Sequence, residues 1–66
     1  MRAGQKVRIT KGDRHYSRAG DFAILLPVDE SGLLWGNFNG LGNDAVYDDG
    51  IWCIAQRGGY ELIGEE

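Results

Sequence analysis

A thiol and an imidazole are the two side chains of this chain that could combine in nucleophilic catalysis. The chain has one cysteine, Cys53, and one histidine, His15. Such a pair must lie within hydrogen-bond reach, and a third group usually orients the base. The sequence indicates no third group, and Cys53 lies inside the apolar run IWCIA, where a thiol is typical of packing. We therefore expect a solvated His15, no catalytic residue, no cofactor and no enzyme activity.

The adjacent carboxylates Asp48 and Asp49 are the next candidates, for a metal or proton-transfer site. Neighbours on a strand point to opposite faces, so these two converge on one ion only within a turn. The segment lacks the alternating acidic positions and the distant glutamate of a calcium loop. Asp49-Gly50 is a favoured tight-turn dipeptide, and one cysteine plus one histidine cannot complete a tetrahedral zinc site. We predict a turn and no metal site.

The segment KGDRHYSRAG, residues 11–20, combines positive charge with an aromatic ring. This composition suits stacking on a base together with phosphate contacts. It equally suits a protein interface, where Tyr and Arg are enriched among the residues that dominate affinity. An ordinary solvated loop is the third interpretation, although long loops in compact domains are often functional. The predicted binding residues are Lys11, Arg14, His15, Tyr16, Arg18 and, on a later strand, Trp35.

The two tryptophans, Trp35 and Trp52, each bring a large apolar area to a core that is short of residues. A small barrel can bury only one of them fully, and the other is then a natural aromatic contact for a partner. Strand alternation leaves open which of the two is exposed.

The elements that must position these residues belong to a small domain. The 66 residues form one unit, 1–66, and a domain of this size buries only about 60% of the surface that its unfolded chain exposes. No room remains for a core plus a deep catalytic cavity. The single cysteine excludes an internal disulfide, so regular packing or a partner must support the fold. We expect a monomer or a weak homodimer.

The N-terminal segment MRAGQKVRIT lacks the apolar core of a signal peptide and the length of a membrane span. We therefore expect a cytoplasmic protein with no membrane association. The unpaired cysteine agrees with a reducing compartment.

The formal net charge of −3 hides an asymmetry along the chain. Residues 1–20 carry a net charge of +5, whereas residues 21–66 carry −8. This distribution fits a basic binding face. It also fits a basic first strand that lies beside acidic later strands and pairs with them across a sheet. We favour the pairing, because an acidic chain repels phosphate at long range.

Short strands joined by glycine-containing turns are predicted along the chain. The run QKVRIT alternates so that Val7 and Ile9 point inward. In FAILLPVD, Phe22 and Ile24 share one face and Ala23 and Leu25 share the other. The later predicted strands are LLWGNF, IWCIA and YELI.

Glycines mark the predicted turns and irregularities between these strands. Gly36 stands where LLWGNF would carry a bulge or a sharp curve. Asn39-Gly40 is the strongest short hairpin signal in the chain. The segment DESG, residues 29–32, is a turn by composition, with Gly32 available for a positive φ angle.

Five short strands, one long early loop and no helix predict an all-β fold. A sheet this small covers both of its faces only if it curls up on itself. Closure also removes exposed strand edges that would template aggregation. The predicted architecture is a small five-stranded, SH3-like barrel, and an open three- or four-stranded sheet that dimerises is the alternative.

The stretch GQKVRITKG, followed after a loop by AGDFAILLPVD, resembles the KOW motif, in which a Gly-x-x-Val-x-Val strand is followed by a glycine that opens the next apolar strand. The resemblance covers about residues 4–29 and implies an SH3-like barrel that binds RNA, ribosomal components or transcription machinery. Gly20 would match the glycine of the motif, and the basic contacts would be Lys6, Arg8, Lys11 and Arg14. The loop before Gly20 is longer than in the motif, and the second half is acidic, unlike most RNA-binding examples.

The whole chain, with WGNFNG and VYDDGIW before a terminal YELI, is also similar to small SH3-like barrels encoded by tailed bacteriophages. This resemblance implies a fold and almost no chemistry. The favoured hypothesis is a non-catalytic module, a small phage-type accessory or host-modulating protein that binds another protein. The alternative is a KOW-type nucleic-acid-binding module that uses the basic N-terminal strand and the loop 11–20.

Overall fold

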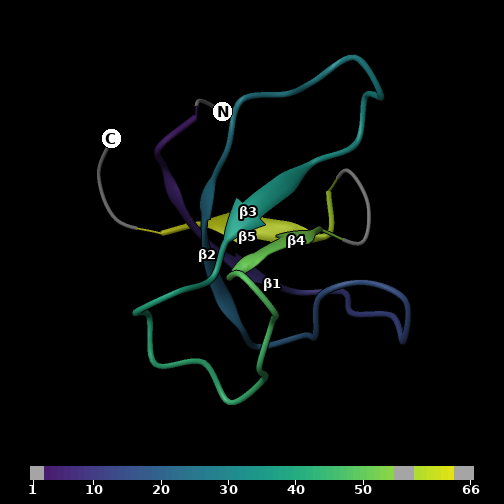
Figure 1. Ribbon diagram of the computed structural model, residues 1–66. Coiled ribbons are helices and arrows are strands. Elements are labelled where there is room, and N and C mark those ends of the chain that lie inside the picture. The colour runs from purple at the N-terminus through teal and green to yellow at the C-terminus, as the bar shows by residue number, and fades with distance from the viewer. Residues whose placement is uncertain (1–2, 55–57, 64–66) are drawn as a thin grey trace.

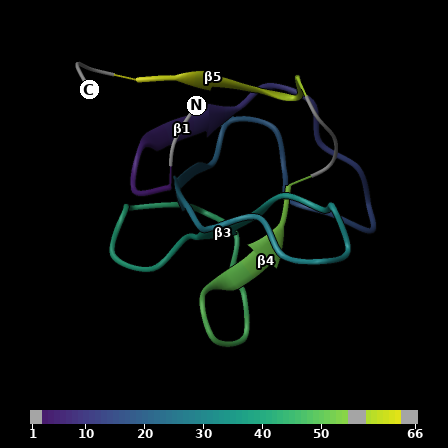
Figure 2. The ribbon, with the colours of Figure 1, turned by 90° about the horizontal axis from the view of Figure 1, so that it is seen from above.

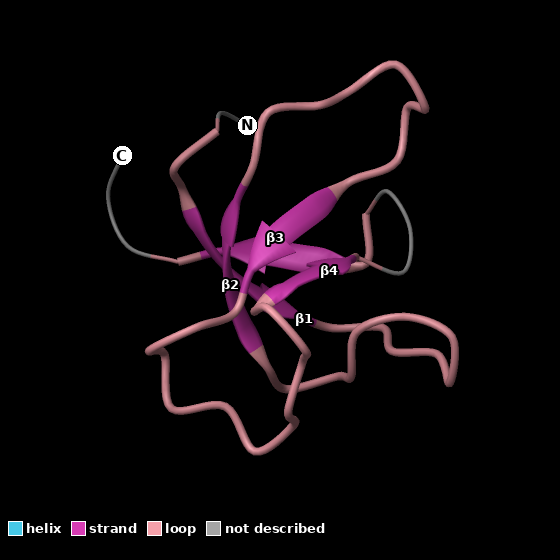
Figure 3. Cartoon of the chain, in the orientation of Figure 1, coloured by secondary structure: helices cyan, strands magenta, loops and turns pink. Residues whose placement is uncertain are grey.

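The computed structural model describes residues 3–54 and 58–63. Within these ranges the chain forms five strands and no helix (Figures 1 and 3). The strands are β1 (Lys6–Ile9), β2 (Phe22–Leu25), β3 (Trp35–Asn37), β4 (Ile51–Cys53) and β5 (Tyr60–Leu62). The all-β class is confirmed. No helix in the described part of the chain could cross a membrane.

The five strands form one sheet in the order β4-β3-β2-β1-β5, with every neighbouring pair antiparallel. The sheet is curled, so that β1 and β5 lie on one side of the molecule and β3 and β4 on the other (Figure 2). Strands β4 and β5 are its two ends, and no pairing in the described residues joins them. Closure into a complete barrel therefore stays a prediction.

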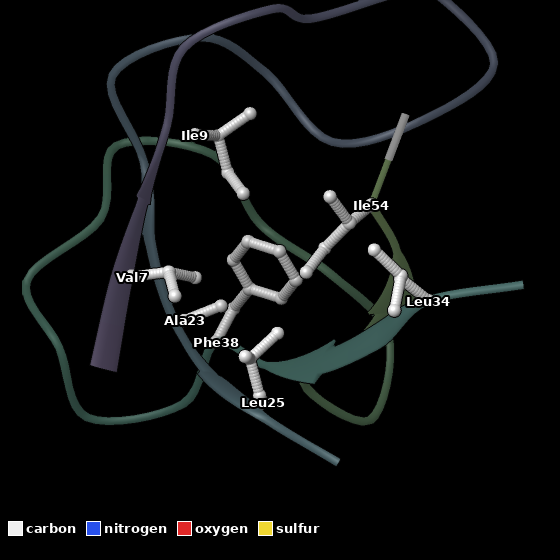
Figure 4. Packing of buried hydrophobic residues seen from close by; sticks show 7 residues of the cluster. All are labelled: Val7, Ile9, Ala23, Leu25, Leu34, Phe38 and Ile54. Carbon is white, nitrogen blue, oxygen red and sulfur yellow. The ribbon is translucent and has the colours of Figure 1, made fainter. Parts of the chain in front are cut away.

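The hydrophobic core fills the inside of the curled sheet. Val7 and Ile9 are completely buried, as the alternation of β1 predicts. In β2 the inward face is that of Ala23 and Leu25. The cluster surrounds the ring of Phe38 (Figure 4) and consists of Val7, Ile9, Ala23, Leu25, Leu34, Phe38 and Ile54.

Gly36 lies at the centre of this packing and forms no bulge. The register runs without interruption through it, with Leu25 opposite on β2 and Trp52 opposite on β4. A Cβ at this position would lie 2.8 Å from the Cβ of Ala23. Of the two predicted irregularities, a bulge or a sharp curve, the register excludes the bulge, and the missing side chain permits close contact between β2 and β3.

The Asn39-Gly40 dipeptide does not form a two-residue hairpin. Strands β3 and β4 pair as an antiparallel hairpin, but residues 38–50 connect them as a long loop. Gly40 has the expected positive φ of 72°, within a turn inside this loop. The side-chain amide of Asn39 spans the loop and donates a hydrogen bond of 3.3 Å to the carbonyl of Asp49. Gly40 therefore adopts the turn conformation that the sequence predicts, although a long loop and not a two-residue turn connects β3 to β4.

The predicted turns at the ends of strands are present. The amide of Gly50 donates to the carbonyl of Tyr47 over 3.2 Å, and Gly50 has a φ of 82°. Oδ1 of Asp49 accepts the amide of Ile51 at 2.9 Å, which closes the turn directly before β4. The turn at residues 29–32 is also confirmed, with Gly32 at a φ of 79°.

Part of the N-terminal positive charge is compensated within the sheet. Arg8 lies opposite Glu61 in the β1–β5 register, and Nε of the arginine is 3.4 Å from Oε2 of the glutamate. The ammonium of Lys6 lies 5.2 Å from the ring centroid of Phe22. Arg8 is thus paired with an acidic residue of a neighbouring strand, in agreement with the favoured interpretation of the charge asymmetry, whereas Lys6 contacts an aromatic ring.

Candidate functional site

The loop 11–20 is fastened to the sheet at its far end. The amide of Ser17 donates to the carbonyl of Cys53 on β4 over 3.1 Å, and Ser17 is completely buried. The amide of Gly20 donates to the carbonyl of Ile9 over 2.7 Å, where the loop returns to β2. The loop therefore lies against the β4 end of the curled sheet, although it starts from β1 near the opposite end.

Gly12 allows the two legs of this loop to cross in close contact. A Cβ on Gly12 would lie 2.5 Å from the backbone nitrogen of Ala19 and 3.0 Å from the Cα of Arg18. Any larger residue would push the legs apart, because backbone atoms cannot move out of the way as a flexible side chain can. The compact loop holds its longer side chains outward, and Lys11, Arg14 and His15 are all exposed.

The loop 38–50 is the second loop of the candidate site, and the side chain of Asn43 holds it in place. Its Oδ1 accepts the amide of Phe22 at 2.6 Å. Its Nδ2 donates to the carbonyls of Phe22 at 2.8 Å and of Phe38 at 3.0 Å. One amide side chain thereby satisfies backbone groups at the start of β2 and directly after β3, beyond the residue pairs of the β2–β3 register.

Tyr47 connects the loop 38–50 to the loop 11–20. Its hydroxyl donates to Oδ2 of Asp21 over 2.8 Å and accepts the amide of Arg18 at 3.1 Å. Burial raises the pKa of this hydroxyl, the amide of Arg18 lowers it in part, and the hydrogen bond to Asp21 raises it further. The Tyr47 ring lies 4.5 Å from the Phe38 ring and 5.9 Å from the Trp52 ring, centroid to centroid. A chain of aromatic contacts thus runs from the core to the surface.

Between the two loops lies an open groove of about 840 Å³. We call it the loop groove. Its aromatic lining comes from Tyr16, Tyr47 and Trp52, and its charged lining from Arg14, Arg18, Asp13, Asp44 and Asp48. Both charge signs and three aromatic rings therefore face one surface depression, and Trp52 is 37% exposed there.

The structure brings three of the predicted binding residues into this groove, namely Arg14, Tyr16 and Arg18. Lys11 and His15 are exposed on the same loop but do not line the groove. Trp35 lies elsewhere: it is half-buried on β3, and its indole nitrogen is buried without a hydrogen-bond partner in the described residues.

Trp52 is the tryptophan that lines the groove. It lies opposite Gly36 on β3, at the end of the sheet, and reaches Tyr47. Sequence reasoning also missed Tyr47, Asp44 and Val46 as groove residues. The length and polarity of residues 38–50 could have indicated a functional loop. The hairpin signal at Asn39-Gly40 instead favoured a short connection.

The acidic pair has two separate roles. Asp49 caps the turn before β4, as described above, whereas Asp48 lines the loop groove. Among residues 3–54 and 58–63, no group of three His, Cys, Asp or Glu side chains is arranged to hold a metal ion.

Cys53 is a buried residue of β4. Burial raises the pKa of its thiol, and the charge of Asp29 raises it further. The sulfur lies 3.5 Å from the carbonyl oxygen of Ile54. A raised pKa disfavours the thiolate, which is the nucleophilic form.

Comparison of the chain with known protein families, curated proteins and solved structures finds no match. The geometry of the loop groove therefore carries the functional inference.

Proposed function

We propose that the protein is a non-catalytic interaction module that binds another protein through the loop groove. The observation that carries this proposal is the convergence of Tyr16, Tyr47 and Trp52 with arginines in one open depression. Aromatic residues and arginine are enriched in protein interfaces and dominate their affinity. The groove is built on the edge of the sheet and held by the hydrogen bonds of Tyr47 and Asn43, so little ordering entropy is lost when a partner binds.

The groove charges favour a protein over a nucleic acid as the partner. Arg14 and Arg18 could contact phosphate, but Asp13, Asp44 and Asp48 line the same depression. The whole chain has a net charge of −3, which opposes long-range attraction of a polyanion. A KOW-type nucleic-acid-binding module is therefore the second candidate, supported by the exposed cations of the loop 11–20.

The resemblance to small phage-encoded barrels adds a biological setting to the proposal. In that setting the protein is an accessory or host-modulating factor, and its partner is a protein of the bacterial cell. A small module that binds through the loop groove suits such a role, because occupying a surface of the partner is sufficient to change the activity of that partner.

Selection from a displayed library of random peptides, with the purified protein immobilised, tests the proposal. We expect a family of related peptides to be enriched. Replacement Trp52→Ala should weaken the best peptide by about 30-fold or more, the loss typical of a dominant interface residue. The control is Val28→Ala, which removes an exposed apolar side chain outside the groove and should leave affinity unchanged. Equal losses in both variants would overturn the proposal.

A titration with single-stranded RNA and DNA tests the second candidate. We expect negligible binding between about 50 and 200 mM salt, whereas a protein that relies on phosphate contacts loses affinity steeply over this range. Variants Lys11→Glu and Arg14→Glu separate the two candidates further. Binding through the groove should depend more on Arg14, while phosphate binding should depend on both cations.

A further inference from the structure

The two loops that flank the loop groove carry opposite charges toward it. Arg14 and Arg18 belong to the loop 11–20, which also contributes Asp13, and Asp44 and Asp48 belong to the loop 38–50. The side chains of Arg14, Asp44 and Asp48 make no hydrogen bond or ion pair with any described residue. They are exposed. These exposed charges are therefore accessible to a partner.

Apolar side chains line the same groove as these charges. Val46 stands between the two acidic residues in sequence, lines the groove and is 95% exposed. Trp52 offers part of its indole at the groove floor. An apolar side chain of a partner that packs on Val46 and Trp52 would therefore lie in the groove that Asp44 and Asp48 line from one loop and Arg14 and Arg18 line from the other.

We infer that the occupant of the loop groove is an extended segment of a partner protein in which an apolar residue is flanked by a basic residue on one side and an acidic residue on the other. The basic residue pairs with Asp44 and Asp48. The acidic residue pairs with Arg14 and Arg18. This inference rests on the proposed protein-binding function and specifies the chemistry of the bound segment.

Charge complementarity with the two loops determines the orientation of the bound segment more than it increases the affinity for that segment. Each solvent-exposed ion pair contributes little by itself, because water screens it. A segment bound in the reverse direction, however, would bring like charges together on both walls, and such contacts oppose binding. A nucleic acid carries only negative charge, so Arg14 and Arg18 would attract it, whereas Asp44 and Asp48 would repel it.

Charge-swap variants in the peptide selection test the inference. Peptides enriched on the original protein should share the basic, apolar and acidic pattern in one order. For such a peptide, Asp48→Lys should weaken binding by about tenfold. The matched control is Glu30→Lys, an equal charge change on an exposed residue outside the groove. A peptide whose basic residue is replaced by Glu should bind Asp48→Lys more tightly than it binds the original protein.

The outcomes separate this inference from the proposed function. Enriched peptides without the charge pattern, or equal effects of Asp48→Lys and Glu30→Lys, would show the inference to be wrong. If Trp52→Ala still removed binding in that case, the proposed function would stand. Failure to enrich any peptide would count against both. Circular dichroism of each variant confirms that the sheet is retained.

Discussion

The hydroxyl of Tyr47 donates a hydrogen bond of 2.8 Å to Oδ2 of Asp21, which is only 6% exposed. This contact joins the loop 38–50 to the end of the loop 11–20, 26 residues earlier in the chain. The same hydroxyl accepts the amide of Arg18, and the ring packs between Phe38 and Trp52. One side chain therefore connects both groove walls to the core.

Replacement Tyr47→Phe should lower the free energy of unfolding by about 1–3 kcal/mol, because it leaves a buried carboxylate without its donor. Urea denaturation followed by tryptophan fluorescence measures the change. The control is Tyr16→Phe, since the Tyr16 ring is exposed on the loop and its hydroxyl bonds to no described residue. We expect that control to stay within about 0.5 kcal/mol of the original protein. Equal effects of the two replacements would contradict this role of Tyr47.

The stability of the protein should fall at alkaline pH, in part because of Tyr47. Burial raises the pKa of its hydroxyl in the folded state above the ordinary value of about 10. The folded protein thus keeps this proton at pH values where the unfolded chain has lost it. The resulting stabilisation is present below about pH 10 and disappears as the pH rises through the folded pKa. Urea midpoints measured from pH 8 upward should decline less steeply in Tyr47→Phe, and parallel curves would refute the assignment.

Replacement Asn43→Ala should destabilise the protein more than Asn39→Ala. Asn43 makes three hydrogen bonds to backbone groups of Phe22 and Phe38 in a partly buried position. Loss of these bonds should cost about 2–3 kcal/mol of unfolding free energy. Asn39 donates one exposed bond of 3.3 Å, so its loss should cost about 0.5–1 kcal/mol. Thermal denaturation ranks the two variants, and the reverse order would be inconsistent with Asn43 as the brace of this loop.

Replacement Gly12→Ala should open the loop 11–20 while the sheet stays folded. The new Cβ would meet the backbone of Ala19 at 2.5 Å, so the crossing legs must separate. Amide hydrogen exchange should then show faster exchange at Ser17, whose amide is bonded to Cys53. The amide of Ile9, bonded to Asp21, serves as an internal reference for the sheet. Unchanged protection of Ser17 would show that the crossing tolerates a side chain.

Cys53 should react slowly with a thiol reagent in the native protein. Its side chain is buried, and the raised pKa lowers the thiolate fraction at neutral pH. Labelling should accelerate by at least about tenfold in denaturing urea, where the thiol becomes exposed. Native labelling as fast as unfolded labelling would argue for a reactive cysteine, and loss of that reactivity in His15→Ala would reopen the nucleophilic interpretation.

The sequence pattern predicted the structure correctly at positions where a single local property decides the conformation. The alternation in QKVRIT placed Val7 and Ile9 in the core, because side chains of a strand alternate between two faces and only one of these faces is apolar. Asp49-Gly50 formed the predicted turn, because the glycine accepts a positive φ and the carboxylate accepts a nearby amide. The same reasoning failed at Asn39-Gly40, which lies inside the long loop 38–50, where the Asn39 side chain bonds to the carbonyl of Asp49 ten residues later.

The sequence by itself determined an all-β chain of five short strands and a long cationic loop at residues 11–20, because periodicity, turn residues and charge are read within a few neighbouring positions. Only the tertiary structure decided which apolar face of β2 turned inward, since both faces offer similar hydrophobicity and the choice depends on what packs against them. It also selected Trp52 in place of Trp35 for the loop groove and brought Asp44 to the same depression as Arg14. These residues are far apart along the chain, and folding of the sheet, which no local pattern encodes, brings them together.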